Sequence, residues 1–247
     1  RYVMEDNLYD ATVNQLDAAL YGQTYYTSTA EQGEKALGLA GSQYVQLPYE
    51  IASTEELTFA TWINWRKSTP INQRIFDFGN GTRQYMYLTP SNGSKMSFVV
   101  NDGTGEKTLD CKASLETSAW HHVAVTIGEG RIVIWLDGEE AASTTAITVT
   151  PEKLHPTLNY LGRAQNGSVA FLNAYLDDVR IYNYALTAER LVTDSPSGIK
   201  QLEADDQRAD ASAEAYYTLS GQQVEKPKSG VYILRQGQVG RKVYIGR

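Results

Sequence analysis

The chain has 247 residues and a formal net charge of −7, from 22 basic and 29 acidic side chains. This length fits one large all-β domain, or a medium domain with an appendage. Its basic residues are scattered, so the concentrated positive surface that binds a phosphate backbone is missing and nucleic acid is not an expected partner. No run approaches the roughly 20 apolar residues that a membrane helix requires.

Short runs of alternating apolar and polar residues recur along the first three quarters of the chain. The predicted strands are LTFATWINW (57–65), RIFDFG (74–79), YMYL (85–88), KMSFVV (95–100), HHVAVTI (121–127), RIVIWLDG (131–138), AITV (146–149), LNYLG (158–162) and LDDVRIYN (176–183). The sequences between them, such as GNGT, SNGS and GEGR, are typical of hairpin turns. The pattern predicts an all-β fold, a two-sheet antiparallel β-sandwich or jelly roll.

Helix is scarce, and its clearest candidate is LTAERLVT at 186–193, where Thr187 is a predicted N-cap. Beyond it the composition becomes charged and Ala-rich, which predicts a linker over 195–213. Strand signals return in a small C-terminal β segment, 214–247, which is too short to bury much of a core. Cys111 has no partner cysteine in the chain and is interpreted as a buried thiol.

The stretch WHHVAVTIGEGRIVIWLDGEE, residues 120–140, contains residues that enzymes use. Neighbouring side chains of a strand point to opposite faces, so His121 and His122 are not expected to bind one metal ion. The third histidine, His155, stands alone in KLHPTL, and no zinc-binding spacing occurs. The stretch is therefore predicted to be a hairpin, with Glu139 and Glu140 at a solvated tip.

The same stretch resembles the Trp-His-His-Val-Ala signature hairpin of laminin-G-like jelly rolls, in the concanavalin A-like lectin/glucanase superfamily. Three other segments fit that family in the expected order: EKALGLAGSQYVQLP (34–48), LTFATWINW (57–65) and FLNAYLDDVRIYNYAL (171–186). The resemblance covers residues 1 to about 194 and implies the fold. It does not select a function, because this fold serves lectins, adhesion modules and hydrolases alike.

Catalysis is not expected. Hydrolases of this superfamily commonly carry a Glu-x-Asp-x-x-Glu pattern on one strand, where the carboxylates line one sheet face. The nearest approach here, Glu203 and Asp205 in the linker, has Arg208 in place of the second glutamate. A serine nucleophile motif of the GxSxG type is also missing from the sequence.

The carboxylate of Asp177 is predicted to be buried, so its negative charge requires a partner. In LDDVRIYN, strand alternation places Asp177 on the same face as Val179 and Ile181, which are expected to enter the core. A buried carboxylate needs a partner, either an arginine or a hard cation such as Ca²⁺. The family resemblance implies a structural calcium site at this Asp, with Asp10 and then Glu5 from the N-terminal segment as further ligands.

A glycan is the expected ligand, because sugar rings stack on aromatic side chains. Tyr85 and Tyr87 share one face of RQYMYL and are candidate platform residues, and the pair Tyr25 and Tyr26 in GQTYYTST is a second candidate. The tryptophans at framework positions of the family are expected to pack rather than bind sugar: Trp62, Trp120 and Trp135.

Residues 214–247 resemble the C-terminal segments of exported Bacteroidetes proteins, and the alternative is an additional hairpin. The chain is expected to be secreted, periplasmic or exposed at the cell surface, as part of a larger polypeptide. The leading hypothesis is a non-catalytic accessory module that binds carbohydrate and is attached to the catalytic domain of a glycoside hydrolase. A structural or protein-interaction (adhesion) module is the alternative, and a divergent glycoside hydrolase is a third hypothesis.

Overall fold

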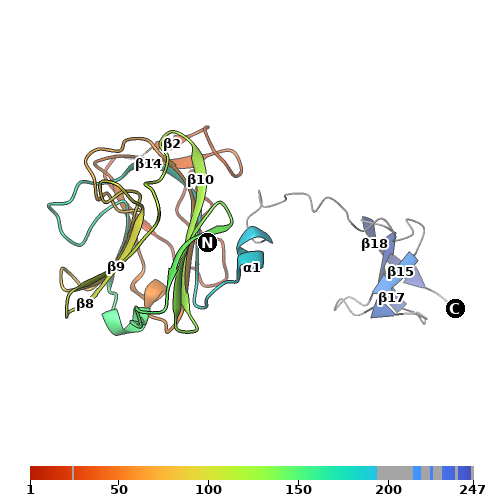
Figure 1. The fold of residues 1–247 in the computed structure, drawn as a ribbon. Helices are drawn as coiled ribbons and strands as arrows, with labels where there is room; N and C mark the ends of the chain where they lie inside the picture. The colour runs from red at the N-terminus through yellow and green to blue at the C-terminus, as the bar shows by residue number, and fades with distance from the viewer. Residues whose placement is uncertain (24, 194–213, 218–222, 225–229, 237–238, 246–247) are drawn as a thin grey trace. The chain divides into compact units, whose positions relative to one another are not determined.

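The computed structural model describes residues 1–23, 25–193, 214–217, 223–224, 230–236 and 239–245. The chain divides into two compact units, Arg1–Ile199 and Lys200–Arg247. The first unit contains two antiparallel seven-stranded sheets packed face to face (Figure 1), so the predicted β-sandwich is confirmed. Among the described residues, no helix is long and apolar enough to cross a membrane.

The two sheets join strands that are far apart in the sequence. Sheet 1 contains, in spatial order, β1 (Ala19–Tyr21), β4 (Tyr44–Leu47), β13 (Leu158–Leu161), β6 (Phe76–Gly79), β7 (Gln84–Thr89), β8 (Ser97–Asp102) and β9 (Glu106–Asp110). Sheet 2 contains β12 (Glu139–Thr144), β11 (Arg131–Leu136), β10 (Trp120–Gly128), β5 (Leu57–Trp65), β14 (Asn173–Tyr182), β3 (Ala36–Ala40) and β2 (Tyr25–Thr27). The short helices η1 (Tyr49–Ala52) and η2 (Pro151–Leu154) connect one sheet to the other, and α1 (Ala188–Thr193) follows β14.

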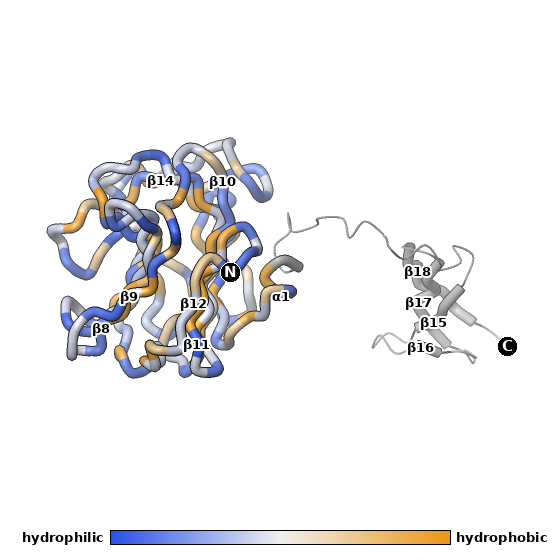
Figure 2. Tube along the Cα trace, in the orientation of Figure 1, coloured by the Kyte–Doolittle hydropathy of each residue, from blue (hydrophilic) through white to orange (hydrophobic). Residues whose placement is uncertain are grey.

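The main core lies between the sheets and is rich in phenylalanine. The ring of Phe59 on β5 lies 4.4 Å from that of Phe76 on β6, which in turn lies 4.7 Å from Phe78. All three side chains are fully buried. Figure 2 shows hydrophobic residues recurring along the strands, with hydrophilic residues in many of the connecting loops. Burial of these side chains is the main stabilising contribution to the sandwich.

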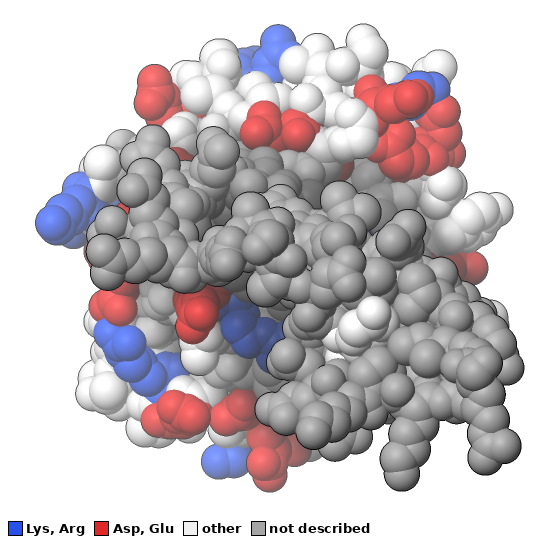
Figure 3. Space-filling view, turned by 90° about the vertical axis from the view of Figure 1, so that its right-hand side faces the viewer, with Lys and Arg blue, Asp and Glu red and all other residues white. Residues whose placement is uncertain are grey.

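A second, smaller apolar cluster lies on the outer face of sheet 2. It contains Ala60, Ala124, Val133, Trp135, Leu186 and Leu191. Leu191 belongs to α1, so the predicted helix is confirmed and covers this part of the sheet. On the face of the molecule drawn in Figure 3, acidic and basic side chains of the described residues are interspersed rather than gathered by sign.

The hairpin predicted at 120–140 is confirmed, with β10 and β11 paired from Val123 and Leu136 down to the turn. His121 and His122 point to opposite faces: the first lies with Nδ1 2.8 Å from a carboxylate oxygen of Asp137, and the second is buried with its ring 5.3 Å from that of Trp62. Burial lowers the pKa of His122 to about 4, and the nearby Arg180 charge acts in the same direction.

Two local predictions are wrong. Residues 146–149, AITV, lie outside any strand, although Ile147 is buried in the main core. The strand in this region is β12, where Glu139 pairs with Leu136 and Glu140 pairs with Trp135. The two glutamates are exposed, as predicted, but they begin a strand after the turn rather than form its tip. Glu140 accepts a hydrogen bond of 2.7 Å from the guanidinium of Arg131 across the same pair of strands. A strand held by such an ion pair needs no alternation of apolar and polar residues, so the sequence pattern does not indicate β12.

The second unit contains a four-stranded antiparallel sheet in the order β16 (Gln223–Val224), β15 (Glu214–Tyr217), β17 (Gly230–Gln236) and β18 (Val239–Ile245). The C-terminal segment thus contains the β-strands that its sequence predicts. The predicted linker, 195–213, lies outside the described residues.

His122 makes the fold sensitive to acid. In the unfolded chain its pKa is about 6.5, so between that pH and about 4 the unfolded state binds a proton that the folded state does not. Stability contributed by His122 is therefore lost as the pH falls. Between these pH values we expect the wild type to lose up to about 1.4 kcal/mol of unfolding free energy per pH unit more than His122→Gln loses. Urea unfolding of both proteins at about pH 7 and about pH 5 measures this difference. The exposed His155→Gln is the control, and an equal acid response in the wild type and His122→Gln would contradict the assignment.

Candidate functional site

The outer face of sheet 1 carries a group of tyrosines that we call the tyrosine belt. Tyr160 on β13 pairs with Asp77 on β6, which pairs with Tyr87 on β7. Cross-strand partners point to the same face, so these side chains form one row, with core residues on the other side of each strand. The belt contains Tyr21, Tyr44, Tyr85, Tyr87 and Tyr160.

One end of the belt is open to solvent. Tyr21 is 43% exposed, and its ring stacks on that of Tyr44 with centroids 4.7 Å apart. The ring of Tyr160 meets Tyr44 edge-on at 5.6 Å. The guanidinium carbon of Arg163 lies 4.6 Å from the Tyr44 centroid and 4.8 Å from that of Tyr160. This end therefore offers flat aromatic surface beside a cation.

A groove lies next to this open end. Phe171 packs against Tyr44 with ring centroids 5.8 Å apart, and Phe171 also lines the groove, whose volume is about 640 Å³. Three loops form its walls, residues 41–42, 70–72 and 167–171. The lining of the groove combines apolar side chains with hydroxyl and amide groups. A sugar ring needs both kinds of contact.

Tyr85 and Tyr87 share a face of β7, as predicted, and their rings stack with centroids 5.9 Å apart. The guanidinium carbon of Arg74 lies 3.4 Å from the Tyr87 centroid, and Tyr87 is only 6% exposed. The Tyr85 hydroxyl donates a hydrogen bond of 2.7 Å to Glu106. Of this predicted pair, Tyr85 is therefore the accessible member.

Asp77 occupies the centre of the belt and is 2% exposed. Its Oδ2 accepts a hydrogen bond of 3.1 Å from the amide of Gln165 and lies 3.5 Å from Arg74 Nε. Its Oδ1 has no hydrogen-bond partner among the described residues. Burial raises the pKa of Asp77 to about 7, although the contacts with Gln165 and Arg74 act in the opposite direction.

Sequence reasoning missed Asp77, Arg163 and three of the tyrosines. The run RIFDFG did contain a signal for Asp77, because strand alternation places it opposite the two phenylalanines. The tyrosines at 21, 44 and 160 lie on strands that are joined only by the sheet topology, and no local pattern brings them together.

The second predicted ligand pair does not form one surface. Tyr25 and Tyr26 lie in the strand β2 rather than in a loop, so they point to opposite faces. Tyr26 packs against the main core, whereas Tyr25 is 44% exposed on the outer face of sheet 2. The two predicted pairs of tyrosines therefore lie on different sheets.

The prediction that Asp177 shares a face with Val179 and Ile181 is wrong. The register of β14 against β5 shifts between Asp177 and Arg180, which marks a β-bulge. The extra residue lets both Leu176 and Val179 enter the core, although regular alternation would separate them. Asp177, which follows Leu176, therefore points to the outer side of sheet 2.

Asp177 is nevertheless fully buried, as predicted. Its Oδ2 accepts hydrogen bonds from the amides of Glu31 (3.1 Å) and Gln32 (2.8 Å), and its Oδ1 has no partner among the described residues. Burial raises the pKa of Asp177 to about 6 against the effect of those amides. The nearby Arg180 does not compensate it, because its Nη2 lies 2.7 Å from Asp178.

Glu5 reaches the same loop as Asp177. Its Oε1 accepts hydrogen bonds from the amides of Glu34 (2.8 Å) and Lys35 (3.3 Å), in the segment that connects β2 to β3. Asp177 binds the preceding part of that segment, so two of the three predicted calcium ligands contact one loop. The unpartnered, buried Oδ1 of Asp177 is the feature of this region that fits a cation.

Asp10 is engaged elsewhere. Its carboxylate accepts hydrogen bonds from the amide (3.0 Å) and hydroxyl (2.8 Å) of Thr12 and from the amide of Leu16 (3.1 Å). Burial alone would raise the pKa of Asp10, but these bonds outweigh it and lower the pKa to about 2. Within the described part of the chain, no group of three or more His, Cys, Asp or Glu side chains is arranged to hold a metal ion.

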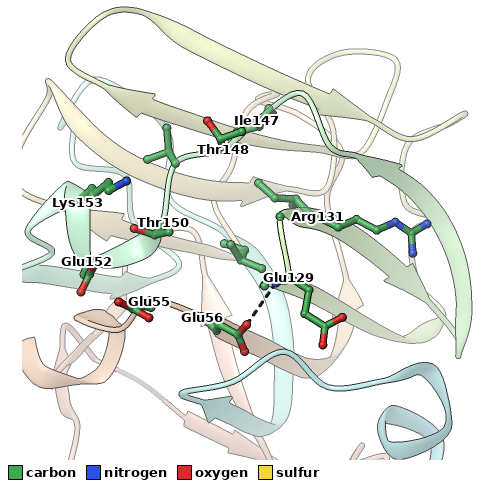
Figure 4. A pocket seen from close by; sticks show the side chains of 14 residues that line it. Glu55, Glu56, Glu129, Arg131, Ile147, Thr148, Thr150, Glu152 and Lys153 are labelled. Atoms are coloured by element: carbon green, nitrogen blue, oxygen red, sulfur yellow. Dashed lines mark hydrogen bonds between the residues drawn. The ribbon is translucent and has the colours of Figure 1, made fainter.

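A separate cleft of about 420 Å³ lies between the β10–β11 turn and the η2 region (Figure 4). Glu55, Glu56, Glu129 and Glu152 line it together with Arg131 and Lys153. The Glu56 carboxylate accepts hydrogen bonds from the amides of Glu129 (3.2 Å) and Ala185 (3.2 Å). Glu56 therefore has a structural role, joining the hairpin turn to the chain before α1.

The similarity to solved structures is extensive but distant. Domain 4 of AbnA, a GH43 extracellular arabinanase from Geobacillus stearothermophilus solved with arabinotriose, is 19% identical with a TM-score of 0.65, over 77% of this chain and 93% of that one. The Ruminococcus gnavus IT-sialidase CBM40 bound to α2,3 sialyllactose is 16% identical with a TM-score of 0.55, over 64% and 95%. The botulinum neurotoxin serotype C1 binding domain is 12% identical with a TM-score of 0.61, over 94% and 64%.

At these identities the structural similarity shows a shared fold. No curated protein matches the chain. The family model described as the concanavalin A-like lectin/glucanases superfamily matches residues 39–191, which span the sandwich from β3 to α1 and include the hairpin of the two histidines. The chain belongs to the concanavalin A-like lectin/glucanases superfamily.

Proposed function

We propose that the chain is a non-catalytic module that binds carbohydrate on the tyrosine belt. The observation that carries this proposal is the aromatic surface at the open end of the belt, where the Tyr21 and Tyr44 rings stack 4.7 Å apart beside Arg163. The C–H-rich face of a sugar ring stacks on such rings, while its hydroxyls need polar neighbours. The groove beside Phe171 extends this surface beyond the sheet.

Two further features support a glycan rather than a flat apolar ligand. Tyrosine presents an apolar ring with a polar hydroxyl, and Arg163 adds a donor between two of the rings. The structurally similar arabinanase domain and sialidase module were solved with arabinotriose and sialyllactose, respectively. They support the ligand class proposed for this chain.

The setting of the module is part of the same proposal. The chain would act outside the cytoplasm, as an accessory to the catalytic domain of a glycoside hydrolase that it holds close to an insoluble or polymeric substrate. The segment 214–247 would serve in export, in line with its resemblance to sorting tails. A module that instead recognises proteins in adhesion would leave the belt without any glycan ligand.

We also propose a structural Ca²⁺ site at Asp177, where a buried carboxylate oxygen has no partner among the described residues. Glu5, whose carboxylate contacts the same β2–β3 segment, is the second proposed ligand, and backbone carbonyls would complete the oxygen-rich coordination that Ca²⁺ prefers. Asp10 is left out of this ligand set, because Thr12 and Leu16 already occupy its carboxylate. Calcium would hold the β2–β3 segment against the end of sheet 2.

Glycan binding should depend on the open end of the belt. We expect Tyr44→Ala to weaken binding at least tenfold, a loss of about 1.4 kcal/mol, because the stacking surface shared with Tyr21 and Phe171 is removed. Affinity gels with arabinan and other soluble polysaccharides, followed by titration calorimetry, provide the measurement. The control is Tyr49→Ala, at an exposed tyrosine on η1 outside the belt. A wild-type chain that binds no polysaccharide in the screen would contradict the proposal.

Calcium binding should raise the melting temperature, and a chelator should lower it. The response should disappear in Asp177→Asn, because the ligand oxygen is replaced, and should persist in Asp10→Asn. Differential scanning calorimetry with and without Ca²⁺ measures both. If neither Ca²⁺ nor the chelator changes the melting temperature of the wild type, the site is ruled out.

A further inference from the structure

The outer face of sheet 2 carries a second aromatic row, on the opposite side of the sandwich from the tyrosine belt. Tyr25, Gly38, Tyr175, Asn64 and Trp120 are successive register partners on β2, β3, β14, β5 and β10. Side chains in such a line share one face and extend across five strands, about 19 Å at the usual strand spacing. The outer faces of two packed sheets point in opposite directions, so this row and the belt are separate surfaces.

Gly38 shapes this row. A Cβ atom at position 38 would lie 2.5 Å from Cζ of Tyr25, so the Tyr25 ring lies directly over the glycine backbone. From there the ring meets Tyr175 edge-on, with centroids 6.2 Å apart, and Tyr175 lies 6.5 Å from Trp120. Tyr25 is 44% exposed, and the other two rings are half-buried. The result is a stepped aromatic surface on which several sugar rings could rest.

Polar groups without partners accompany these rings. Asn64, which lies between Tyr175 and Trp120 in the row, is 7% exposed, and its Oδ1 has no hydrogen-bond partner among the described residues. The indole Nε1 of Trp120 is likewise buried and unpartnered there. An unsatisfied buried polar atom is costly, and each such atom in a folded protein calls for an explanation. A hydroxyl-rich ligand on this face would supply the missing partners.

Arg66 places a positive charge beside the aromatic row. Its guanidinium carbon lies 4.6 Å from the Tyr175 centroid, and the side chain is exposed. No ion pair joins it to an acidic side chain within residues 1–23 and 25–193. A planar guanidinium held over a ring is suited to two parallel hydrogen bonds with a carboxylate.

The same face is closed at its other end. Leu186 and Leu191 pack against Ala60, Ala124 and Trp135 there, so the α1 region covers that end of the face. Along β10, the covered Ala124 and the aromatic row at Trp120 are separated by a single outward residue, His122. The row is thus the part of this face that the sandwich leaves without an apolar cover among the described residues.

We propose that this row is a second carbohydrate site, specific for a polysaccharide that contains uronic acid. A sugar ring stacks on Tyr25, its carboxylate pairs with the Arg66 guanidinium held over Tyr175, and hydroxyls bind Asn64 and Trp120. The inference goes beyond the proposed belt site and does not depend on it. A module with two such faces would hold two polysaccharide chains at once.

The test uses the full chain with polygalacturonate as the acidic probe and arabinan as the neutral one. We expect Arg66→Gln to weaken polygalacturonate binding at least tenfold while leaving arabinan binding unchanged. Tyr175→Ala should have the same effect, and Tyr44→Ala on the belt should leave polygalacturonate binding intact. Added salt should weaken the acidic probe alone, because the Arg66 pair is exposed to screening. Arg66 is a surface residue, so its variant is expected to fold even if Tyr175→Ala does not.

The proposal is overturned if polygalacturonate does not bind, or if its binding is lost in Tyr44→Ala and kept in Arg66→Gln. Either result leaves arabinan binding by the belt as a separate measurement, so the failure of one site is not mistaken for the failure of the other. Equal loss of both probes in Arg66→Gln would also contradict the assignment of two separate sites.

Discussion

Strand alternation is the constraint on which the rest of this structure depends. Each residue of a strand is committed to one face, so the same short run must supply both the core and the surface. In β6, the two phenylalanines enter the core and Asp77 between them faces outward. In β10, the valines enter the core while Trp120, His122 and Ala124 face outward. The two outer surfaces follow from this division, because they display the side chains that do not enter the core between the sheets.

The sandwich displays two different surfaces as a result. Sheet 1 presents tyrosines with Asp77 and two arginines, and sheet 2 presents an aromatic row at one end and a helix-covered apolar cluster at the other. Carboxylates, by contrast, are used mainly as acceptors for backbone amides: Glu5, Asp10 and Asp177 each hold a loop in place. This division of roles fits a module that recognises ligands on rigid sheet faces.

Much of the fold could be predicted from the sequence where the alternation is regular. The run 57–65 is β5 residue for residue, and the outward and inward faces of β10 are as expected. The failures have physical causes. A bulge after Asp177 reverses the faces that simple counting assigns, and a strand paired through Arg131 and Glu140 lacks the apolar signal. The sites themselves were harder to predict, because Tyr44, Tyr160 and Asp77 meet only through pairings between distant strands.

The central proposal is that polysaccharide binds the outer face of sheet 1, and chemical-shift mapping of the labelled chain with a neutral arabinan oligosaccharide tests it most directly. The account predicts that the largest shift changes fall on β1, β4 and β13 and on the loop that carries Phe171. Changes confined to the glutamate-lined cleft beside the β10–β11 turn, or to the loop between β2 and β3, would contradict it.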